Sequence, residues 1–243
     1  MKKISLSGRT AIVTGATSGV GRAIALDLAS AGAHVMLVAR REKALKELVT
    51  SILENGGSAG AWPTDLGKDD SVEHLAAIVR ETVSGVDVLV HSAGIFTLGV
   101  TEAASVHDLD AQYRINIRGP FLLTQKLIPA LRHAKGQVVF VNSTAGKSAR
   151  AGVGSYAASK HALKAVADSL REEVNGEGIR VLSVFLGRTN TPMQAEVFRL
   201  EGRSYNPDLL IQPEDVARLT RQILLLPDTA EVTEITIRPM KKA

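Results

Sequence analysis

Two kinds of apolar segment alternate along the chain from one end to the other. Short continuous apolar runs are typical of strands buried on both faces, and longer runs with an apolar residue every three or four positions are typical of helices. Strands are expected at residues 10–14, 34–39, 58–65, 86–94, 137–143, 180–187 and 234–238. Helices are expected at residues 20–32, 41–57, 69–83 and 106–131, from about residue 155, and from Pro213.

This alternation predicts a parallel sheet that is covered by helices on both faces. Right-handed crossovers then give a Rossmann-type, doubly wound α/β fold of about seven strands in three layers. With no internal repeat or linker, residues 1–243 are expected to form a single domain. The long irregular stretch 187–211 is expected to be a substrate loop or lid. Within 69–83, Asp70 stands three residues before Glu73, which is a capping-box pattern.

Composition narrows the class of protein. The 243 residues include no cysteine, which excludes thiol nucleophiles, cysteine-ligated iron–sulfur clusters and disulfide scaffolds. The net charge of +4 raises the question of nucleic-acid binding, but the basic residues are spread along the chain instead of forming a stripe. No apolar run approaches the ~20 residues that span a bilayer. A soluble cytoplasmic protein without a nucleic-acid or membrane partner is therefore expected.

The glycine-rich stretch TGATSGVG, residues 14–21, joins the first strand to the first helix. Glycines allow a sharp turn and a close approach of the backbone to phosphate oxygens, and the amides that open the helix favour an anion. A glycine-bearing turn without a ligand is the alternative. The placement favours a nucleotide, with contacts expected from Gly15, Thr17, Ser18, Gly19, Val20 and Gly21.

The end of the second strand indicates which nucleotide is bound. NAD-binding folds usually have an acidic residue there for the ribose 2′-hydroxyl. This chain has Ala39, followed by Arg40 and Arg41, and a guanidinium matches a 2′-phosphate in charge and geometry. The alternative is that both arginines simply begin a solvated helix. NADP(H) is therefore expected in preference to NAD(H).

A tyrosine and a lysine stand four residues apart in SYAASK, residues 155–160. At 3.6 residues per turn, Tyr156 and Lys160 extend the apolar face of their helix. An ammonium one turn away should favour the phenolate and lower the pKa of the tyrosine. A tyrosine tuned in this way could exchange a proton with a carbonyl or alcohol oxygen. The spacing alone is common by chance.

The glycine loop, VNSTAG (141–146) and SYAASK together resemble the short-chain dehydrogenase/reductase family, in its order and spacing, over about residues 6–192. The resemblance implies that Tyr156 is the acid/base and that Lys160 lowers its pKa and holds the nicotinamide ribose. It also implies that Ser143 binds the substrate oxygen and that Asn116 fixes a water that relays protons. Alternatively, Ser143 caps a strand end, Asn116 braces the sheet, and Thr144 supplies the hydroxyl.

The resemblance extends to further cofactor contacts, and it includes departures from the family pattern. HSAG (91–94) stands where the family has Asn-Asn-Ala-Gly, and His91 is expected to brace a turn instead of acting as a base. Leu186 replaces the proline that usually precedes the glycine of the nicotinamide segment, and the common Asp-Gly-Gly ending is absent. Contacts to the adenine, the cofactor turn and the carboxamide are expected from Asp65, Leu66, Ser92, Ala93, Gly94, Thr189 and Thr191.

The expected function is reversible hydride transfer between NADP(H) and a carbonyl or alcohol substrate, without a metal. A non-catalytic NADP-binding sensor on the same fold is the alternative, and an isomerase or dehydratase that retains its cofactor is another. A homodimer or homotetramer is expected, although the altered ending puts the usual tetramer packing in doubt. The sequence does not indicate the substrate. Two alternatives, an apolar substrate pocket and ordinary core and loop packing, account equally well for Ile95, Phe96, Leu98, Val153, Met193, Phe198 and Tyr205.

Overall fold

The computed structural model describes residues 5–241, and within them seven strands form one parallel sheet. The strand order is β3-β2-β1-β4-β5-β6-β7, and every neighbouring pair is parallel. This is the doubly wound sheet that the sequence predicts. The strands are β1 Thr10–Thr14, β2 His34–Ala39, β3 Ser58–Pro63, β4 Val88–His91, β5 Gln137–Ser143, β6 Arg180–Leu186 and β7 Glu234–Ile237.

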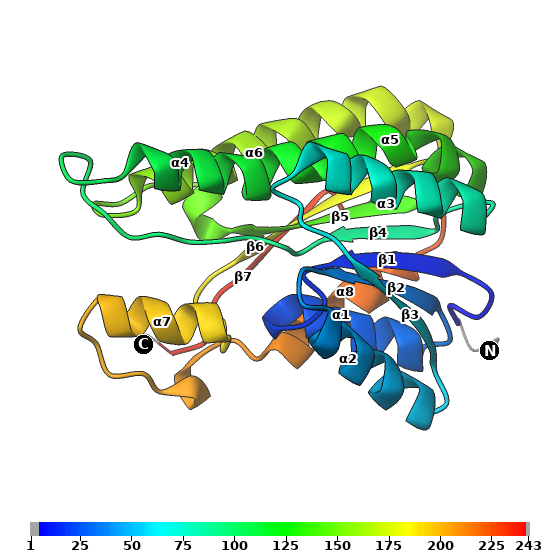
Figure 1. Ribbon diagram of the computed structural model, residues 1–243, viewed down its shortest axis with the longest axis horizontal. Coiled ribbons are helices and arrows are strands. Elements are labelled where there is room, and N and C mark those ends of the chain that lie inside the picture. Colours follow the sequence, from blue (N-terminus) through cyan, green and yellow to red (C-terminus); the bar gives the residue numbers. More distant parts are fainter. Residues whose placement is uncertain (1–4, 242–243) are drawn as a thin grey trace.

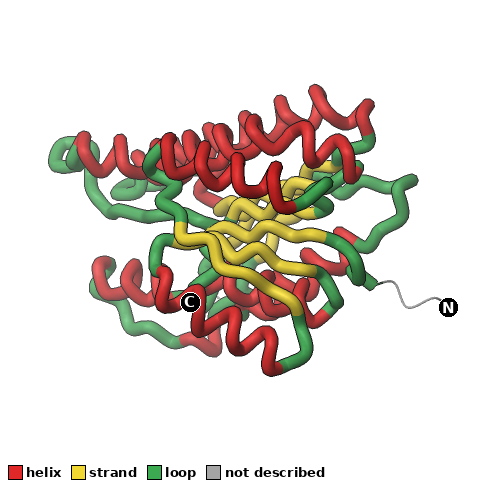
Figure 2. The backbone as a smooth tube through the Cα atoms, turned by 45° about the vertical axis from the view of Figure 1, so that its right-hand side comes forward, coloured by secondary structure: helices red, strands yellow, loops and turns green. Residues whose placement is uncertain are grey.

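Helices cover both faces of the sheet, so the chain forms three layers (Figures 1 and 2). Helices α3 to α6 lie on one face, and α1, α2 and α8 lie on the other (Figure 1). In the described part of the chain, no helix is both long and apolar enough to cross a membrane. The helices are α1 Gly19–Ser30, α2 Glu42–Glu54, α3 Asp69–Thr82, α4 Val106–Tyr113, α5 Gly119–Ala134, α6 Gly154–Val174, α7 Pro192–Leu200 and α8 Pro213–Leu224.

The sheet divides the apolar core into two clusters, because successive side chains of a strand point to opposite faces. In β1, Val13 packs with α1 and α2, whereas Ile12 packs with α3, α5 and α6. Both side chains are fully buried. Burial on both faces explains why these strands read as continuous apolar runs in the sequence.

The strand order reverses between β1 and β4, and Thr14 holds the two strand ends together there. Its hydroxyl donates to the carbonyl of Val90 at 3.2 Å and accepts from the amides of Ser92 and Ala93 at 3.1 and 3.2 Å. The loops that follow β1 and β4 therefore diverge from one point, which the hydrogen bonds of Thr14 hold fixed. Such a crevice at the carboxyl ends of the strands is where doubly wound folds bind ligands.

The helix expected over 106–131 extends to Ala134, and it is interrupted by a π-helical turn at Arg114–Arg118. One extra residue in such a turn shifts the faces of the helix that follows, and π-helical turns are frequent at functional sites. Asn116 lies in this turn and is buried. The apolar period could not reveal the interruption, because the chain stays helical through it.

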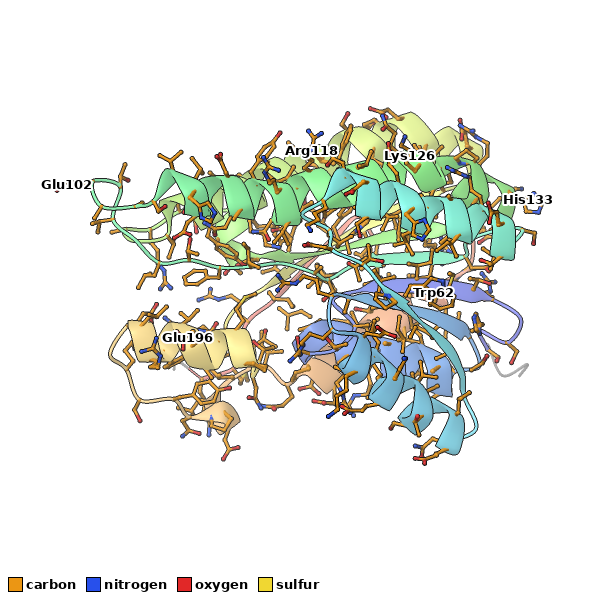
Figure 3. The ribbon with its side chains drawn as sticks, viewed as in Figure 1. Trp62, Glu102, Arg118, Lys126, His133 and Glu196 are labelled. Atoms are coloured by element: carbon orange, nitrogen blue, oxygen red, sulfur yellow. The ribbon has the colours of Figure 1, made fainter. Side chains whose placement is uncertain are left out.

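The capping box expected at Asp70 and Glu73 is wrong. Helix α3 begins one residue before Asp70, so Asp70 lies inside the first turn, where a residue cannot cap. Its carboxylate instead accepts from the amide of Ser71 at 2.8 Å. Glu73 forms an ion pair at 2.8 Å with Lys126 of α5, on the outer surface of the helical layer (Figure 3).

The expectation of a long irregular segment at 187–211 is wrong for its central part, which is helix α7, Pro192–Leu200. The hydroxyl of Thr191 accepts from the amide of Gln194 at 3.1 Å, and a proline follows at the first helical position. A threonine cap before a proline is a helix-start signal that could be read from the sequence. A short 3-10 turn, Pro207–Leu209, follows in the same segment.

His91, at the end of β4, occupies the middle of the sheet. Its Nε2 pairs with the hydroxyl of Thr124 at 2.8 Å, and its ring stacks on Phe140 with centroids 5.0 Å apart. Burial lowers the pKa of His91 to about 3, so the ring is neutral at physiological pH. His91 does not line the cavity described below. These contacts fit the bracing role expected from the sequence.

His91 should make the protein sensitive to acid. Its pKa is lower in the folded than in the unfolded state, so its stabilising contribution is present above pH 6.5 and is lost as the pH falls towards 3. Between pH 7.5 and 4.5 this group should remove about 2–3 kcal/mol from the free energy of unfolding. Denaturant unfolding of His91→Asn should show a correspondingly weaker dependence on pH, and the exposed His107→Asn should behave like the parent. Equal pH dependence in all three proteins would contradict this account.

Candidate active site

A cavity of about 980 Å³ lies at the carboxyl ends of the strands. The loop after β4, which carries Glu102, and α7, which follows β6 and carries Glu196, lie at this end of the molecule (Figure 3). Two residues of the predicted site, Gly21 and Asn116, are not in the wall. The predicted residues that line it are Gly15, Thr17, Ser18, Gly19, Val20, Arg40, Arg41, Asp65, Leu66, Ser92, Ala93, Gly94, Ser143, Tyr156, Lys160, Thr189 and Thr191.

The glycine loop passes close to the chain that follows β4. Gly15 has a φ of +67°, and a Cβ built on it would lie 2.8 Å from the amide nitrogen of Ala93. A side chain at this position would therefore be both strained and obstructed. Gly21 serves packing, because a Cβ there would lie 2.5 Å from the carbonyl oxygen of Gly15. Both glycines keep the opening of α1 against the loop and leave the cavity clear.

Arg40 and Arg41 are exposed at the cavity wall, directly after β2. Within residues 5–241, neither side chain forms a hydrogen bond or an ion pair. Ala39 also lines the wall, so a carboxylate is missing where an NAD-binding protein would carry one. Two unpaired guanidinium groups beside a nucleotide-sized cavity fit a 2′-phosphate.

The remaining predicted cofactor contacts follow the ends of three further strands, β3, β4 and β6. After β3, the carboxylate of Asp65 accepts from the amide of Gly67 at 3.0 Å. Asp65 and Leu66 both line the cavity. After β6, Thr189 is buried and its hydroxyl donates to the carbonyl of Gly187 at 3.1 Å. Thr191 caps α7 and still lines the cavity. The replacement of proline by Leu186 therefore leaves both threonines at the cavity.

Ser143 and Tyr156 converge at the end of β5. Ser143 is the last residue of that strand, and its hydroxyl accepts from the amide of Ala145 at 3.1 Å. The Ser143 side chain also acts on the phenol of Tyr156, in the first turn of α6, and lowers its pKa. Phe96 packs edge-on against the tyrosine ring at 5.0 Å. Ser143 thus caps the turn and also meets the phenol, and the rival hydroxyl of Thr144 lines the cavity beside it.

The pKa expected for Tyr156 from its spacing to Lys160 is wrong in direction. Burial raises the pKa of Tyr156 to about 12, and the hydrogen bond with Ser143 only partly opposes this. The ammonium of Lys160 lies 5.9 Å from the centre of the tyrosine ring and contributes no resolved change to the pKa. The phenol is therefore protonated at neutral pH. This is the form that donates a proton.

Lys160 is buried. Burying a charge is costly unless the charge has a partner or a function. Its ammonium donates to the carbonyl of Val141, on β5, at 3.2 Å. Burial lowers the pKa of Lys160 to about 8. This bond ties α6 to the sheet at the level of Tyr156 and keeps an ammonium at the cavity wall.

Asn116 supports the site from behind the cavity wall. Its side chain accepts from the amide of Ile95 at 2.9 Å and donates to the carbonyl of Ile95 and the hydroxyl of Ser159, both at 3.0 Å. Ser159 in turn donates to the carbonyl of Tyr156 at 2.7 Å. The asparagine therefore links the loop after β4 to the helix that carries the tyrosine. A Cβ built on Gly94 would lie 3.2 Å from Oδ1 of Asn116 and 3.9 Å from the ammonium of Lys160, so a side chain there would crowd both groups.

Sequence reasoning missed a second link of this kind. Gln112 of α4 is fully buried, and its amide nitrogen donates to the hydroxyls of Thr97 at 2.7 Å and Ser155 at 2.9 Å. It fixes the start of α6 to α4 and to the loop after β4. The sequence signal for Gln112 was weak, because a single glutamine in a largely polar helical segment is usually exposed to solvent.

The candidate substrate residues fall into two groups. Ile95, Phe96, Val153 and Met193 line the cavity, whereas the other three do not. Leu98 is partly exposed elsewhere, and Phe198 is buried against Tyr205 with ring centroids 5.4 Å apart. The sequence did not single out the cationic residues of this part of the wall, which are Arg150, Arg188, Arg238 and Lys241.

Removing the buried charge should stabilise the fold. The pKa of Lys160 is lower in the folded than in the unfolded state, so the charged side chain lowers stability at pH 7, and this cost disappears as the pH rises from about 8 towards 10.5. Lys160→Met should raise the free energy of unfolding at pH 7 by about 2 kcal/mol, after allowing for the lost bond to Val141. Denaturant unfolding should show this gain shrinking between pH 7 and 10. If Lys160→Met is less stable than the parent at pH 7, the buried charge of Lys160 does not lower the free energy of unfolding.

Known proteins resemble this chain throughout its length. A family model described as short chain dehydrogenase matches residues 9–202. An uncharacterized short-chain type dehydrogenase/reductase of Sinorhizobium fredii is 36% identical over 234 residues, which are 94% of this chain and 90% of that protein. Glycine betaine reductase of Emericella nidulans is 35% identical over 240 residues, which are 96% of this chain but only 19% of that much longer protein.

A solved structure agrees with the sequence comparisons. A metagenomic short-chain oxidoreductase, crystallised in complex with NADP, is 31% identical to this chain. Its TM-score is 0.85, and the match covers 98% of this chain and 99% of that one. Together with the matching family model, the fold and the cavity lead to one conclusion: this chain belongs to the short-chain dehydrogenase/reductase family.

Proposed function

We propose that this protein is an NADP(H)-dependent oxidoreductase that transfers a hydride between the nicotinamide and a carbonyl or alcohol substrate. One observation carries the proposal: Ser143, Tyr156 and Lys160 line the same cavity as the glycine loop, and the Ser143 side chain acts on the phenol of Tyr156. A hydroxyl pair with a protonated phenol and a neighbouring cation is suited to binding and protonating a carbonyl oxygen.

The cofactor assignment is supported by the fit of the cavity to a dinucleotide. The pyrophosphate would lie on the glycine loop 15–21, and Arg40 and Arg41 would bind the 2′-phosphate. Asp65 and Leu66 would adjoin the adenine, while Ser92, Ala93, Gly94, Thr189 and Thr191 would hold the nicotinamide end. The similar metagenomic protein was crystallised with NADP. When bound, the reduced nicotinamide supplies the hydride to the carbonyl carbon.

The side chains of the chain itself account for the proton. Tyr156 and Ser143 bind the carbonyl oxygen, and Tyr156 gives up its proton as negative charge develops on that oxygen. The high pKa of Tyr156 keeps the phenol protonated at neutral pH, so the group starts in the form that can donate a proton. Lys160, whose ammonium lies at the cavity wall, would hold the ribose. Oδ1 of Asn116 accepts one hydrogen bond, from the amide of Ile95, and its second lone pair would accept from a relay water.

We also propose that residues 1–243 form a single domain and that the segment 187–211 covers the substrate. The segment contains α7, whose first residues line the cavity and whose later residue Phe198 is packed into the protein. A helix anchored at one side of a cavity can open and close as a unit.

Self-association is proposed through the outer face of α4 and the start of α5. Val106, Leu109 and Tyr113 follow the i, i+3, i+7 spacing of one helix face, and each is more than 40% exposed. Phe121 of α5 is 50% exposed. An apolar surface of this extent on exposed helices is typical of an interface between protein molecules. It supports a homodimer or homotetramer.

The role of Tyr156 is tested by removing one oxygen atom. Tyr156→Phe should lower turnover of carbonyl compounds with NADPH by at least about 100-fold, because the proton donor is lost. Fluorescence titration should give an NADPH dissociation constant within about two-fold of the parent, since the ring remains. Tyr113→Phe, at an exposed position of α4, is the matched control and should keep full turnover. Near-normal turnover by Tyr156→Phe would refute the proposal.

The cofactor preference is tested by reversing a charge. Arg40→Asp should raise the dissociation constant for NADPH by at least about ten-fold and leave that for NADH nearly unchanged, because only NADPH carries the 2′-phosphate. Lys43→Asp, on α2 outside the cavity wall, makes the same change of charge and serves as the control. If Arg40→Asp keeps the parent's preference, Arg40 does not bind the phosphate.

A further inference from the structure

The cavity wall carries more positive charge than the proposed cofactor contacts require. With Arg40, Arg41 and Lys160 set aside, Arg150, Arg188, Arg238 and Lys241 also line the cavity. Among the described residues of the wall, Asp65 is the one carboxylate, and it follows β3, on the other side of the sheet centre from β6. An excess of cations with low-dielectric walls concentrates anionic ligands.

Arg188 is held rigidly at this wall. Its guanidinium donates to the carboxylate of Glu201 at 2.6 Å and lies over the ring of Phe198, 4.5 Å from the centre. The Arg188 side chain is 17% exposed. One of its nitrogens, Nη1, is enclosed by the protein without an acceptor. An arginine oriented by a carboxylate and a ring loses little freedom when it binds an anion.

Arg150 approaches the same carboxylate from the loop before α6. Its guanidinium donates to Glu201 at 3.0 Å, and its side chain is 60% exposed. Arg203 lies at 3.6 Å from Glu201 as a third cation. The carboxylate of Glu201 therefore faces both Arg188 and Arg150, and its single negative charge offsets only one of these two positive charges. Glu201 holds both arginines in place.

Gln194, in the first turn of α7, adds a second donor of the same kind. It lines the cavity, and its Nε2 is also enclosed without an acceptor. An enclosed N–H group without a partner is unfavourable. A ligand that carries oxygen atoms would give both N–H groups an acceptor. Donors without acceptors on one wall favour a ligand rich in acceptors over a neutral alkyl group.

We propose that the substrate carries a carboxylate group apart from its reacting carbonyl, and that Arg188 and Arg150 bind this carboxylate, with Gln194 as a further donor. This rests on the proposed oxidoreductase function and names its substrate class: oxo acids and the corresponding hydroxy acids. A planar carboxylate matches the paired N–H groups of a guanidinium. Ile95, Phe96 and Met193 provide the apolar wall for the carbon chain between the two groups.

The test compares oxo acids with methyl ketones of equal chain length, with phosphorylated ketones as a second anionic series. The parent should have a kcat/KM for oxo acids at least about ten-fold above that for the matched ketones, because charged hydrogen bonds are worth more than neutral contacts. Arg150→Met should reduce this ratio about ten-fold, and Arg150→Lys should restore part of it. Arg188→Met should reduce it further. Arg80→Met, at an exposed position of α3, is the control and should keep the ratio.

Binding provides a readout that does not depend on turnover. Calorimetric titration of an oxo acid into the NADP-loaded protein should give an affinity that falls by about ten-fold in Arg150→Met and weakens as salt is added. If ketones and oxo acids are reduced equally well, or the ratio is unchanged in both arginine variants, the anion site is overturned while the oxidoreductase function stands. If no carbonyl compound is reduced, the proposed function fails, and the titration alone decides whether a carboxylate binds at Arg150. A preference for phosphorylated ketones would overturn the choice of carboxylate.

Discussion

The site depends on a single buried charge, the ammonium of Lys160. Burial disfavours this charge, and its bond to the carbonyl of Val141 offsets only part of the cost. The lysine therefore ties α6 to β5, and Tyr156, one turn earlier, lies in the cavity wall with it. The rest of the architecture supplies what this arrangement needs: a rigid strand end at Ser143, and Asn116 and Gln112 to fix the start of α6.

The environment of Tyr156 sets its protonation state. A phenol with a pKa of about 12 retains its proton at neutral pH. In the proposed reaction the proton would leave only as charge develops on the substrate oxygen. In the proposed complex, Arg150 and Arg188 would act at a different point of the substrate from the phenol. The wall thus carries several cations and one carboxylate, whereas the phenol that would exchange the proton is neutral.

The strands, their parallel arrangement and most of the cavity wall could be predicted, because they follow from local patterns that the parallel sheet brings to one edge. Gly15, Ser143, Tyr156 and Lys160 all belong to such patterns. The pKa of Tyr156 could not be predicted, since the spacing shows a neighbouring lysine but shows neither the burial of both groups nor the bond that Lys160 makes to Val141. The π-helical turn at Asn116 preserves the helical period and was invisible for that reason.

Other features were missed because they join distant parts of the chain. Glu201 meets Arg150 and Arg188 only in the folded protein, and no local pattern links these positions. Gln112 likewise acquires its role through Ser155, 43 residues later. Helix α7 differs from these cases, because Thr191 and the proline after it are a readable start signal. Its omission came from treating the whole of 187–211 as a loop on the basis of its composition.

Transfer of the cofactor's hydrogen to the substrate carbon tests the central claim most directly. The protein would be incubated with a carbonyl substrate and NADPH labelled with deuterium at C4 of the nicotinamide, on the transferable side, and the alcohol would be analysed by mass spectrometry and NMR. The account predicts one deuterium on the carbinol carbon of each product molecule, with one NADP formed for each alcohol. Product without deuterium, or converted substrate with the labelled nucleotide returned unchanged, would contradict it.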